Sequence, residues 1–329
     1  MSSSFKPGLV SVIVASYNHA EFLQERMDSL LNQTYKNIEI IVIDDCSTDN
    51  SREVLRQYKP NQKVRLIERD SNSGWVSVSN QGVALSQGEF IIFANCDDAC
   101  DSGMIVALVD SLQKNPTAGI SFCCSELIDS SGNRLGSDFD QRERSFRAKC
   151  ARDVLLTRGE MTRFLMHSCV IPNLSAALFR KNTYILSGGL TSKYQVCADW
   201  DLFFNVTKKC EVFYISQALN YFRQHETTIR SSTKERKYLL EIIEIILSNI
   251  KLQKSNFYET SKYRLNAMYI LAEYALRPRF DPIINFPYLM LNVLRLDWMA
   301  IVLLPPAFAL RFCNVACKVF KGTGNANSQ

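Results

Sequence analysis

The first 130 residues alternate between apolar, β-branched runs and segments with helical periodicity, and this alternation restricts the fold class. Apolar runs cover residues 9–16, 38–45, 63–68 and 89–94. Helical spacing follows the first run, where Phe22, Leu23, Met27, Leu30 and Leu31 share one face, and recurs near residues 51–58, 76–86 and 104–114. Continuous apolar strands that alternate with helices indicate a mostly parallel sheet covered on both faces. We therefore predict an α/β fold with a central sheet flanked by helices.

Polar side chains follow three of these predicted strands. The first strand ends in Ala15-Ser16-Tyr17-Asn18, the second in Asp44-Asp45, and the fourth in Asn95-Cys96-Asp97-Asp98. Ligands of parallel sheets bind beyond the carboxyl ends of the strands, so these groups are expected in one crevice. Clustered carboxylates repel one another, and Mg²⁺ or Mn²⁺ relieves this with oxygen ligands and substrate phosphates. A simpler interpretation of Asp44-Asp45 is a capped turn before the next helix.

An ordered set of short segments resembles the family 2 glycosyltransferases of the GT-A fold. These segments are residues 10–18 (VSVIVASYN), 30–35 (LLNQTY), 41–49 (IVIDDCSTD), 72–74 (NSG), 80–82 (NQG), 88–91 (GEFI), 187–190 (SGGL), 199–202 (DWDL) and 221–225 (YFRQH). Together they cover roughly residues 9–230 in the family's order and spacing. The resemblance implies a GT-A nucleotide-diphospho-sugar transferase fold, and an inverting enzyme with a metal-bound nucleotide-sugar donor. UDP-sugars are the default donor class.

The resemblance also implies roles for particular residues. Asp199 matches the catalytic base, and Asp97 matches the principal ligand of Mn²⁺ or Mg²⁺, with Asp98 beside it. His225 matches a histidine that closes over the metal or the diphosphate. Asp45 is the first choice to accept a hydrogen bond from a uracil-type ring. The implied donor-binding residues are Ala15, Ser16, Tyr17, Asn18, Asp44, Asp45, Gly74, Asn80, Asn95 and Cys96.

These groups suit displacement at an anomeric carbon. A carboxylate on the acceptor side removes the proton of the attacking hydroxyl. A metal on the other side stabilises the nucleoside diphosphate as it leaves. One base and one metal on opposite faces of the sugar suffice for inversion, without a covalent nucleophile.

Three positions depart from the family pattern. Asn95 replaces the first acid of the Asp-x-Asp motif, Ala198 replaces the Glu before the base, and Ser79 replaces a basic residue. Asp97 and Asp199 are retained, so we expect an active enzyme. The alternative is a non-catalytic nucleotide-sugar-binding scaffold on a degenerate transferase fold.

The predicted domain organisation places a catalytic domain at residues 1–230. Its nucleotide-binding half covers about 9–130 and its acceptor half about 160–230. Residues 231–321 form a helical extension, and 322–329 a disordered tail. Between the two halves, six Lys and Arg side chains over residues 142–158 indicate an exposed loop or a lid. Such a cluster is either solvated or recognises the diphosphate of a lipid-linked acceptor.

The C-terminal segment is basic, with ten Lys or Arg against four Asp or Glu from Lys251 onward. Its longest uncharged apolar run, 298–310, has 13 residues and contains Pro305-Pro306. A spanning helix needs about 20 apolar residues, so this run is expected to lie on a membrane rather than cross it. Trp298 and Phe308 would then enter an anionic interface. Packing of these helices on the catalytic domain is the alternative.

Other classes of protein lack their motifs here. Residues 15–25 contain no glycine, which excludes a Rossmann dinucleotide site, and no Walker A sequence occurs. The basic residues are not interleaved with a nucleic-acid recognition motif. Eleven cysteines without framework spacing and no secretory signal are typical of a reducing cytoplasm. We expect a cytoplasmic enzyme, peripheral on the inner face of the membrane, that acts on a saccharide or polyprenyl-diphosphate-linked acceptor in surface polysaccharide synthesis.

Overall fold

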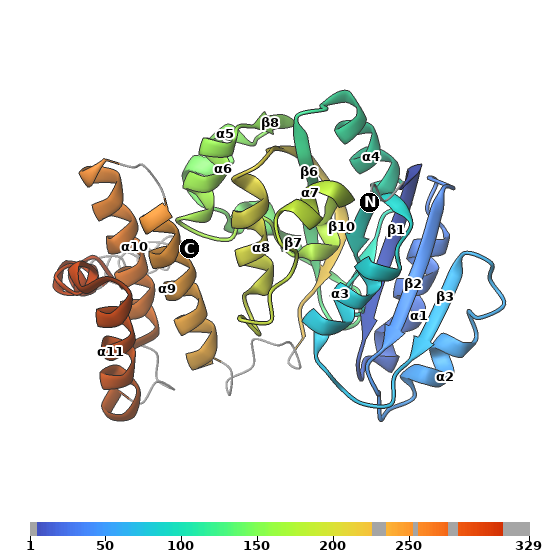
Figure 1. Ribbon diagram of the computed structural model, residues 1–329, viewed down its shortest axis with the longest axis horizontal. Coiled ribbons are helices and arrows are strands. Elements are labelled where there is room, and N and C mark those ends of the chain that lie inside the picture. Colours follow the sequence, from blue (N-terminus) through green and yellow to red (C-terminus); the bar gives the residue numbers. More distant parts are fainter. Residues whose placement is uncertain (1–4, 226–234, 253–255, 276–281, 312–329) are drawn as a thin grey trace, which may run out of the picture. The chain divides into compact units, whose positions relative to one another are not determined.

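A computed structural model describes residues 5–225, 235–252, 256–275 and 282–311. The chain divides into two compact units, Met1–Thr228 and Ile229–Gln329, and each is considered by itself. The first unit is built around one ten-stranded sheet (Figure 1). The second is helical.

The sheet of the first unit has the strand order β3-β2-β1-β4-β9-β6-β10-β5, with β7 beside β6 and β8 beside β10. The strands are β1 (Lys6–Ser16), β2 (Ile38–Asp44), β3 (Val64–Glu68), β4 (Gly88–Phe93), β5 (Ala99–Cys100), β6 (Ala118–Ile128), β7 (Arg134–Ser137), β8 (Val154–Leu156), β9 (Ala177–Arg180) and β10 (Glu211–Arg223). β1 runs parallel to β2 and β4, and β2 parallel to β3. The parallel sheet expected from the first 130 residues is therefore confirmed for this half.

The second half of the sheet is mixed. β9 is antiparallel to both β4 and β6, whereas the long strand β10 runs parallel to β6. β10 also pairs with the short strand β5, which directly follows the Asp97-Asp98 turn. Because β10 ends at Arg223, this pairing carries residues 223–225 to the same edge as the end of β4.

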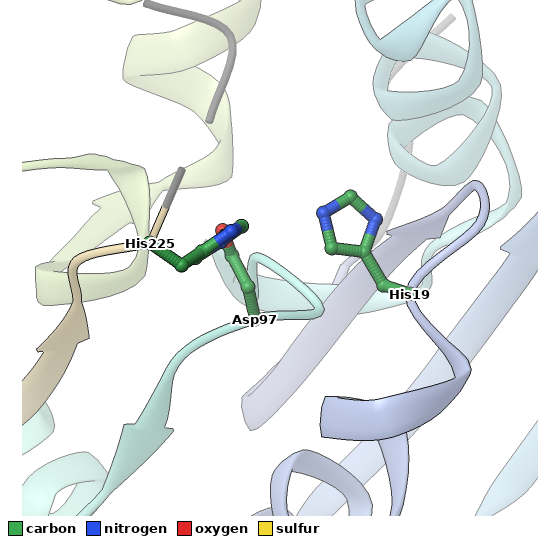
Figure 2. A group of neighbouring side chains, drawn as sticks. All are labelled: His19, Asp97 and His225. Atoms are coloured by element: carbon green, nitrogen blue, oxygen red, sulfur yellow. The ribbon is translucent and has the colours of Figure 1, made fainter. Parts of the chain in front are cut away.

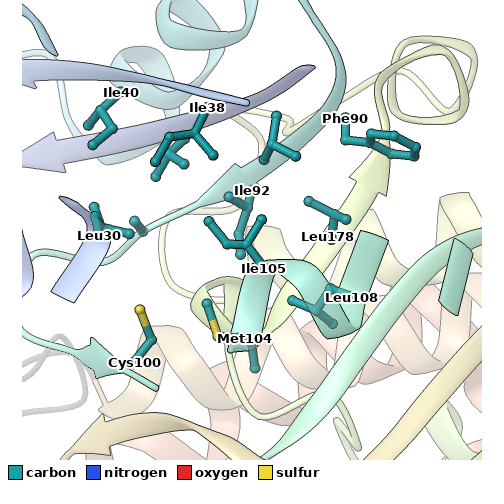
Figure 3. Close-up of a cluster of buried hydrophobic side chains, with 14 of the residues drawn as sticks. Leu30, Ile38, Ile40, Phe90, Ile92, Cys100, Met104, Ile105, Leu108 and Leu178 are labelled. Carbon is teal, nitrogen blue, oxygen red and sulfur yellow. The ribbon is translucent and has the colours of Figure 1, made fainter. Parts of the chain in front are cut away.

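Helices cover both faces of the sheet. In order, they are α1 (Ala20–Leu31), α2 (Ser51–Arg56), α3 (Trp75–Leu85), α4 (Met104–Lys114), α5 (Arg144–Lys149), α6 (Arg158–Leu165), α7 (Lys181–Leu186) and α8 (Ala198–Thr207), with 3₁₀ turns at Asp138–Gln141 and Leu174–Ala176. The larger core joins β1, β2 and β4 to α1 and α4 through side chains such as Leu30, Ile92 and Leu108 (Figure 3). On the opposite face, Val78 of α3 packs with Ile41 and Ile43 of β2.

The segment with clustered basic residues is more ordered than an exposed loop or lid. It contains α5, β8 and the start of α6, and β8 pairs with β10. Phe146 of α5 is buried and lies 5.4 Å, centroid to centroid, from Tyr214. Arg142 is paired with Asp138 and donates to the carbonyl of Cys169 at 2.7 Å. The prediction of a loop missed these contacts because this segment has few apolar residues and they are separated by arginines.

The second unit contains α9 (Glu235–Leu252), α10 (Phe257–Ala275) and α11 (Pro282–Ile301), and α11 bends at Asp297. Within the described residues, no single helix has the length and apolarity of a membrane span. Two consecutive segments, Leu289–Ile301 and Leu304–Arg311, meet that criterion together and are bent by 86°. The predicted tail 322–329 lies outside the described residues.

Candidate active site

The loops after β1, β2 and β4 meet at one edge of the sheet. Ser16 at the end of β1 is in register with Asp44 at the end of β2, and β4 ends beside them at Phe93. Parallel strands bring their carboxyl ends to the same edge, so the loop residues that follow must share one region. The predicted donor-binding residues Ala15 to Asn18 therefore border the loops that carry Asp45 and Asp97.

The loop after β1 is fastened to the loop after β2. The side-chain oxygen of Asn18 accepts from the backbone amide of Thr48 at 2.8 Å, and the backbone amide of Asn18 donates to Ser47 Oγ at 3.0 Å. The next amide, of His19, donates to Ser51 Oγ at 3.1 Å. Asn18 adopts a positive φ of 54°, a conformation that asparagine tolerates better than most residues. Tyr17 stays 43% exposed, with its ring available to a ligand.

Asp44 shapes the turn after β2. Its carboxylate is fully buried, accepts from the amide of Ser47 at 2.9 Å and pairs with Arg52 at 2.8 Å. Ser16 Oγ lies 3.5 Å from the same carboxylate. These partners stabilise the turn after β2, but the alternative in which Ser47 or Asp49 caps the next helix is wrong, because the N-cap of α2 is Asn50 and it makes no side-chain capping hydrogen bond.

Asp45 instead faces the loop before α3. It accepts from the amides of Ser73 at 3.0 Å and Gly74 at 2.8 Å, and Arg69 lies 3.3 Å away. Gly74 has φ of 84°, so the loop needs glycine here. Ser73 Oγ also donates to it at 3.4 Å, and Asp45 is only 3% exposed, so the about four lone-pair positions of this carboxylate already have partners.

Asn80 supports the neighbouring turn. Its amide nitrogen donates to the carbonyl of Leu190 at 2.8 Å, and its oxygen accepts from Tyr184 at 2.9 Å. The Tyr184 hydroxyl in turn accepts from the amide of Leu190 at 2.9 Å. In this structure the predicted donor ligand Asn80 therefore holds the Gly188-Gly189 turn.

Three side chains from distant parts of the sequence converge beyond the end of β4. His225 Nε2 lies 3.0 Å from Asp97 Oδ2, and His19 approaches both (Figure 2). One ligand atom from each of the three lies within 4.8 Å of the other two, a spacing that one metal ion can bridge. Burial raises the pKa of the Asp97 carboxyl, but the hydrogen bond to His225 and the charge of His19 outweigh it and hold this pKa below its usual range.

Asp98 directly follows Asp97 in the chain and has buried partners of its own. It is fully buried and accepts from Asn173 Nδ2 at 2.8 Å and from the amide of Arg223 at 3.0 Å. Burial and the neighbouring charge of Asp97 raise the pKa of Asp98 to about 7. Asn95 Nδ2 lies 3.4 Å from the same carboxylate. The predicted metal ligand Asp98 is thus held by neighbours beneath the site and, in the described part of the chain, is not in the convergent group of ligand atoms.

Cys96 lies between Asn95 and Asp97 and is also buried. Burial, followed by the charge of Asp97, raises the pKa of its thiol. A neutral thiol is a poor metal ligand, because the thiolate is the form that binds metals. Its contribution to a donor site is therefore limited to packing and backbone groups.

Arg223 braces the Asp97-Asp98 turn from the end of β10. Its side chain is 1% exposed, donates from Nε to the carbonyl of Asp97 at 2.7 Å, and pairs with Glu25. The guanidinium also lies 4.9 Å from the centroid of the Phe22 ring. The sequence placed Arg223 in a family-like segment without giving it a role. Its position two residues before His225 was the signal available, and its burial in the folded chain shows that it supports the site.

Asp199 lies in the first turn of α8 and is half-buried. The amide end of a helix favours a negative charge, so this position suits an ionised carboxylate. Trp200 fixes the start of the helix by donating from Nε1 to the carbonyl of Leu165 at 3.2 Å, and α6 and α8 lie side by side (Figure 1). Trp75 at the start of α3 donates to the carbonyl of Gln195, at 2.8 Å, in the loop before α8.

Comparisons with known proteins agree with this architecture. Residues 11–159 match the family described as Glycosyl transferase family 2. The chain is 24% identical to "Glycosyltransferase GlyG" of Streptococcus pneumoniae serotype 4 over 274 residues, which is 81% of this chain and 87% of that protein. Residues 11–159 thus belong to glycosyltransferase family 2, and the chain has a GT-A-like fold. It is a glycosyltransferase.

Two solved structures share the fold. The structure of S. aureus TarS 1-349 in complex with UDP-GlcNAc aligns with a TM-score of 0.65 and 14% identity, over 90% of this chain and 83% of that one. The mannosyltransferase PcManGT from Pyrobaculum calidifontis, in complex with GDP-Man and Mn²⁺, aligns with a TM-score of 0.59 and 15% identity, over 97% and 83%. At this identity the likeness concerns the fold alone.

His19 is the site residue that the sequence did not reveal. It directly follows the predicted donor loop, but a single histidine after a strand end has many interpretations. Only the folded chain brings it to within 6.0 Å, centroid to centroid, of His225.

Proposed function

We propose that this chain is an inverting transferase that moves a sugar from a metal-bound nucleotide-sugar donor, with UDP-sugars as the first candidates. The observation that carries the proposal is the convergence of Asp97 and His225 at the edge where the donor loop and Asp45 also lie. The solved relatives with UDP-GlcNAc and with GDP-Man and Mn²⁺ support donors of this class.

The donor would lie along the loop after β1. Asp45, already organised by two backbone amides, would accept from the imide N–H of a uracil ring in exchange for its longest contact, that with Ser73 Oγ at 3.4 Å. Tyr17, partly exposed in the adjacent loop, offers a ring for stacking against the base. A site built in this way selects a nucleotide by one directional hydrogen bond and one flat contact.

Asp97 and His225 would hold the metal. A carboxylate oxygen and an imidazole nitrogen 3.0 Å apart fit two adjacent positions on one ion, which are about 3 Å apart when each bond is about 2.1 Å. When bound, the ion would offset the negative charge of the departing diphosphate. Arg223 holds the carbonyl of Asp97, so the ligand loop is supported from below.

Asp199 would remove the proton of the acceptor hydroxyl. Its position at the start of α8 favours the ionised form that a base requires. Nothing in this scheme needs a covalent sugar–enzyme bond, and a single displacement inverts the anomeric centre. Ala198 stands where the family has Glu, and the bond from Trp200 to Leu165 helps to fix the start of α8, which carries Asp199.

The acceptor and the cellular location are part of the same proposal. Exposed apolar side chains lie on both sides of the bend in α11 at Asp297, namely Leu291 and Leu294 before it and Trp298 and Val302 after it. We call these four residues the apolar stripe, and Arg295 is exposed beside them. A stripe with aromatic and basic members suits the interface of an anionic bilayer. We therefore propose that the enzyme works at the inner face of the cytoplasmic membrane, on a saccharide or a polyprenyl-diphosphate-linked acceptor of surface polysaccharide synthesis.

The test is release of nucleoside diphosphate from a panel of UDP-, GDP- and dTDP-sugars, with Mn²⁺, with Mg²⁺ and with EDTA. We expect metal-dependent release from one donor of the panel, which would identify it. If no donor is turned over, yet one of them raises the melting temperature in the presence of metal, the chain is a nucleotide-sugar-binding scaffold and the proposal is wrong.

A further inference from the structure

The side chain of His19 has an orientation that helix capping does not explain. It occupies the N-cap position of α1, yet its side chain makes no capping hydrogen bond to the helix. Instead, Nδ1 lies 2.7 Å from the carbonyl oxygen of Tyr17, and the ring faces Asp97 and His225 (Figure 2). This contact fixes the tautomer, because the carbonyl accepts only from a protonated Nδ1. In the neutral ring, Nε2 then carries the lone pair.

We infer that His19 is a third protein ligand of the metal, and that the resulting set of two imidazoles and one carboxylate selects Mn²⁺ over Mg²⁺. The inference rests on the proposed function only for the identity of the substrate that completes the coordination shell. The ligand set itself stands on the convergence of these three side chains.

The geometry around His19 is that of a prepared ligand. Metal-binding histidines almost always donate their second ring nitrogen to a carbonyl or a carboxylate, which orients the ring and raises its basicity. His19 has this support from Tyr17, and its backbone amide is held by Ser51 Oγ at 3.1 Å. Phe22 packs against His225, another member of the set, with 5.1 Å between the two ring centroids.

The spacing permits one ion to take all three groups. Ligands about 2.1 Å from an octahedral ion are about 3 Å apart when adjacent and about 4.2 Å apart when opposite. The three ligand atoms fall within 4.8 Å of one another, so small side-chain adjustments bring them onto one ion. Three positions then remain for diphosphate oxygens and water.

The donor set determines the selectivity. Mg²⁺ prefers oxygen ligands and keeps several of its waters, whereas imidazole suits later first-row metals. Mn²⁺ accepts both oxygen and imidazole, so it satisfies two histidines, Asp97 and a diphosphate at once. A site with oxygen ligands in place of His19 would lose this preference.

The test is electron spin-echo spectroscopy of Mn²⁺ bound to the full chain, with nitrogen couplings counted in the wild type, His19→Ala and His167→Ala. His167 is the remaining histidine of the sequence and serves as the matched control. We expect two coupled imidazoles in the wild type and in His167→Ala, and one in His19→Ala. Titration of the same proteins should show Mn²⁺ affinity about tenfold weaker or more in His19→Ala, with a smaller change for Mg²⁺.

A second variant separates coordination from packing. His19→Asp restores an oxygen ligand, and we expect it to move the preference toward Mg²⁺ while metal-free thermal unfolding stays as in His19→Ala. Two coupled imidazoles in His19→Ala, or an unchanged ratio of Mn²⁺ to Mg²⁺ affinity, would overturn the inference. These readouts need no turnover, so an absence of sugar transfer would contradict the proposed function and leave the metal assignment standing.

Discussion

At the scale of single residues, each aspartate pair has one carboxylate that holds its own turn. Asp45 is also buried and accepts from the amides of Ser73 and Gly74, whereas Asp97 is partly exposed. Asp44 and Asp98 hold the turns, with partners that include Arg52 and Asn173 respectively. Under the proposed function, Asp45 and Asp97 are the members that meet the base of the donor and the metal. Each pair therefore supplies its own support, which keeps the geometry of the edge fixed before substrate binds.

Gly82 shows how closely α3 packs on β1, the strand that leads to the donor loop. A Cβ at Gly82 in α3 would lie 2.4 Å from Ile13 Cγ2 of β1. We predict that Gly82→Ala lowers the free energy of unfolding by about 1–3 kcal/mol through overpacking. Gly159 in α6 is the matched control, since a Cβ there meets nothing within 4 Å, and Gly159→Ala should be neutral or stabilise the fold by about 0.4–1 kcal/mol. Equal losses in urea unfolding of both variants would contradict this packing argument.

The sequence could identify the strand-end residues because strand ends and carboxylates leave a local signal. The local pattern could not tell which member of each pair meets the ligand, and only the resemblance to the family singled out Asp45 and Asp97. It also could not find His19, whose role depends on the pairing of β10 with β5 and on the path of residues 223–225. Such contacts join positions more than 200 residues apart.

At the scale of elements, the alternating pattern was sufficient for the first half of the sheet. Runs predicted at 38–45, 63–68 and 89–94 became β2, β3 and β4 within one or two residues, and α4 covers the predicted 104–114. The second half was harder, because β9 is short and antiparallel and β8 lies in an arginine-rich segment without an apolar run. Tertiary pairing with β10 stabilises such strands, and local sequence does not record it.

The element α11 makes a prediction about membrane binding. Replacing Leu294 and Trp298 by serine removes two exposed members of its apolar stripe, so we expect several-fold weaker co-sedimentation with vesicles that contain anionic lipid. Phe257→Ser in α10 is the control, because this side chain is 76% exposed but lies outside the stripe. Equal binding of the double variant and the wild type would show that the stripe does not contact lipid.

At the scale of the whole molecule, the first unit carries the complete set of proposed donor, metal and base residues. Its sheet brings the loops after β1, β2 and β4 and the end of β10 to one edge. The second unit adds helices with exposed apolar side chains, such as Leu291 and Trp298 of α11. Under the proposed function, the first unit would carry the chemistry and the second would contact the membrane.

The central claim is that Asp199 is the base of a sugar transfer, and the most direct measurement compares Asp199→Asn with Asp201→Asn. Asp201 lies in the same helical turn and accepts from Asn205 at 2.9 Å, so its variant reports the cost of altering α8. With the donor identified by the panel, we predict that Asp199→Asn binds donor and Mn²⁺ as the wild type does, while turnover falls by about 10²–10⁴-fold. Asp201→Asn should retain most of its turnover. Full turnover in Asp199→Asn would contradict the account.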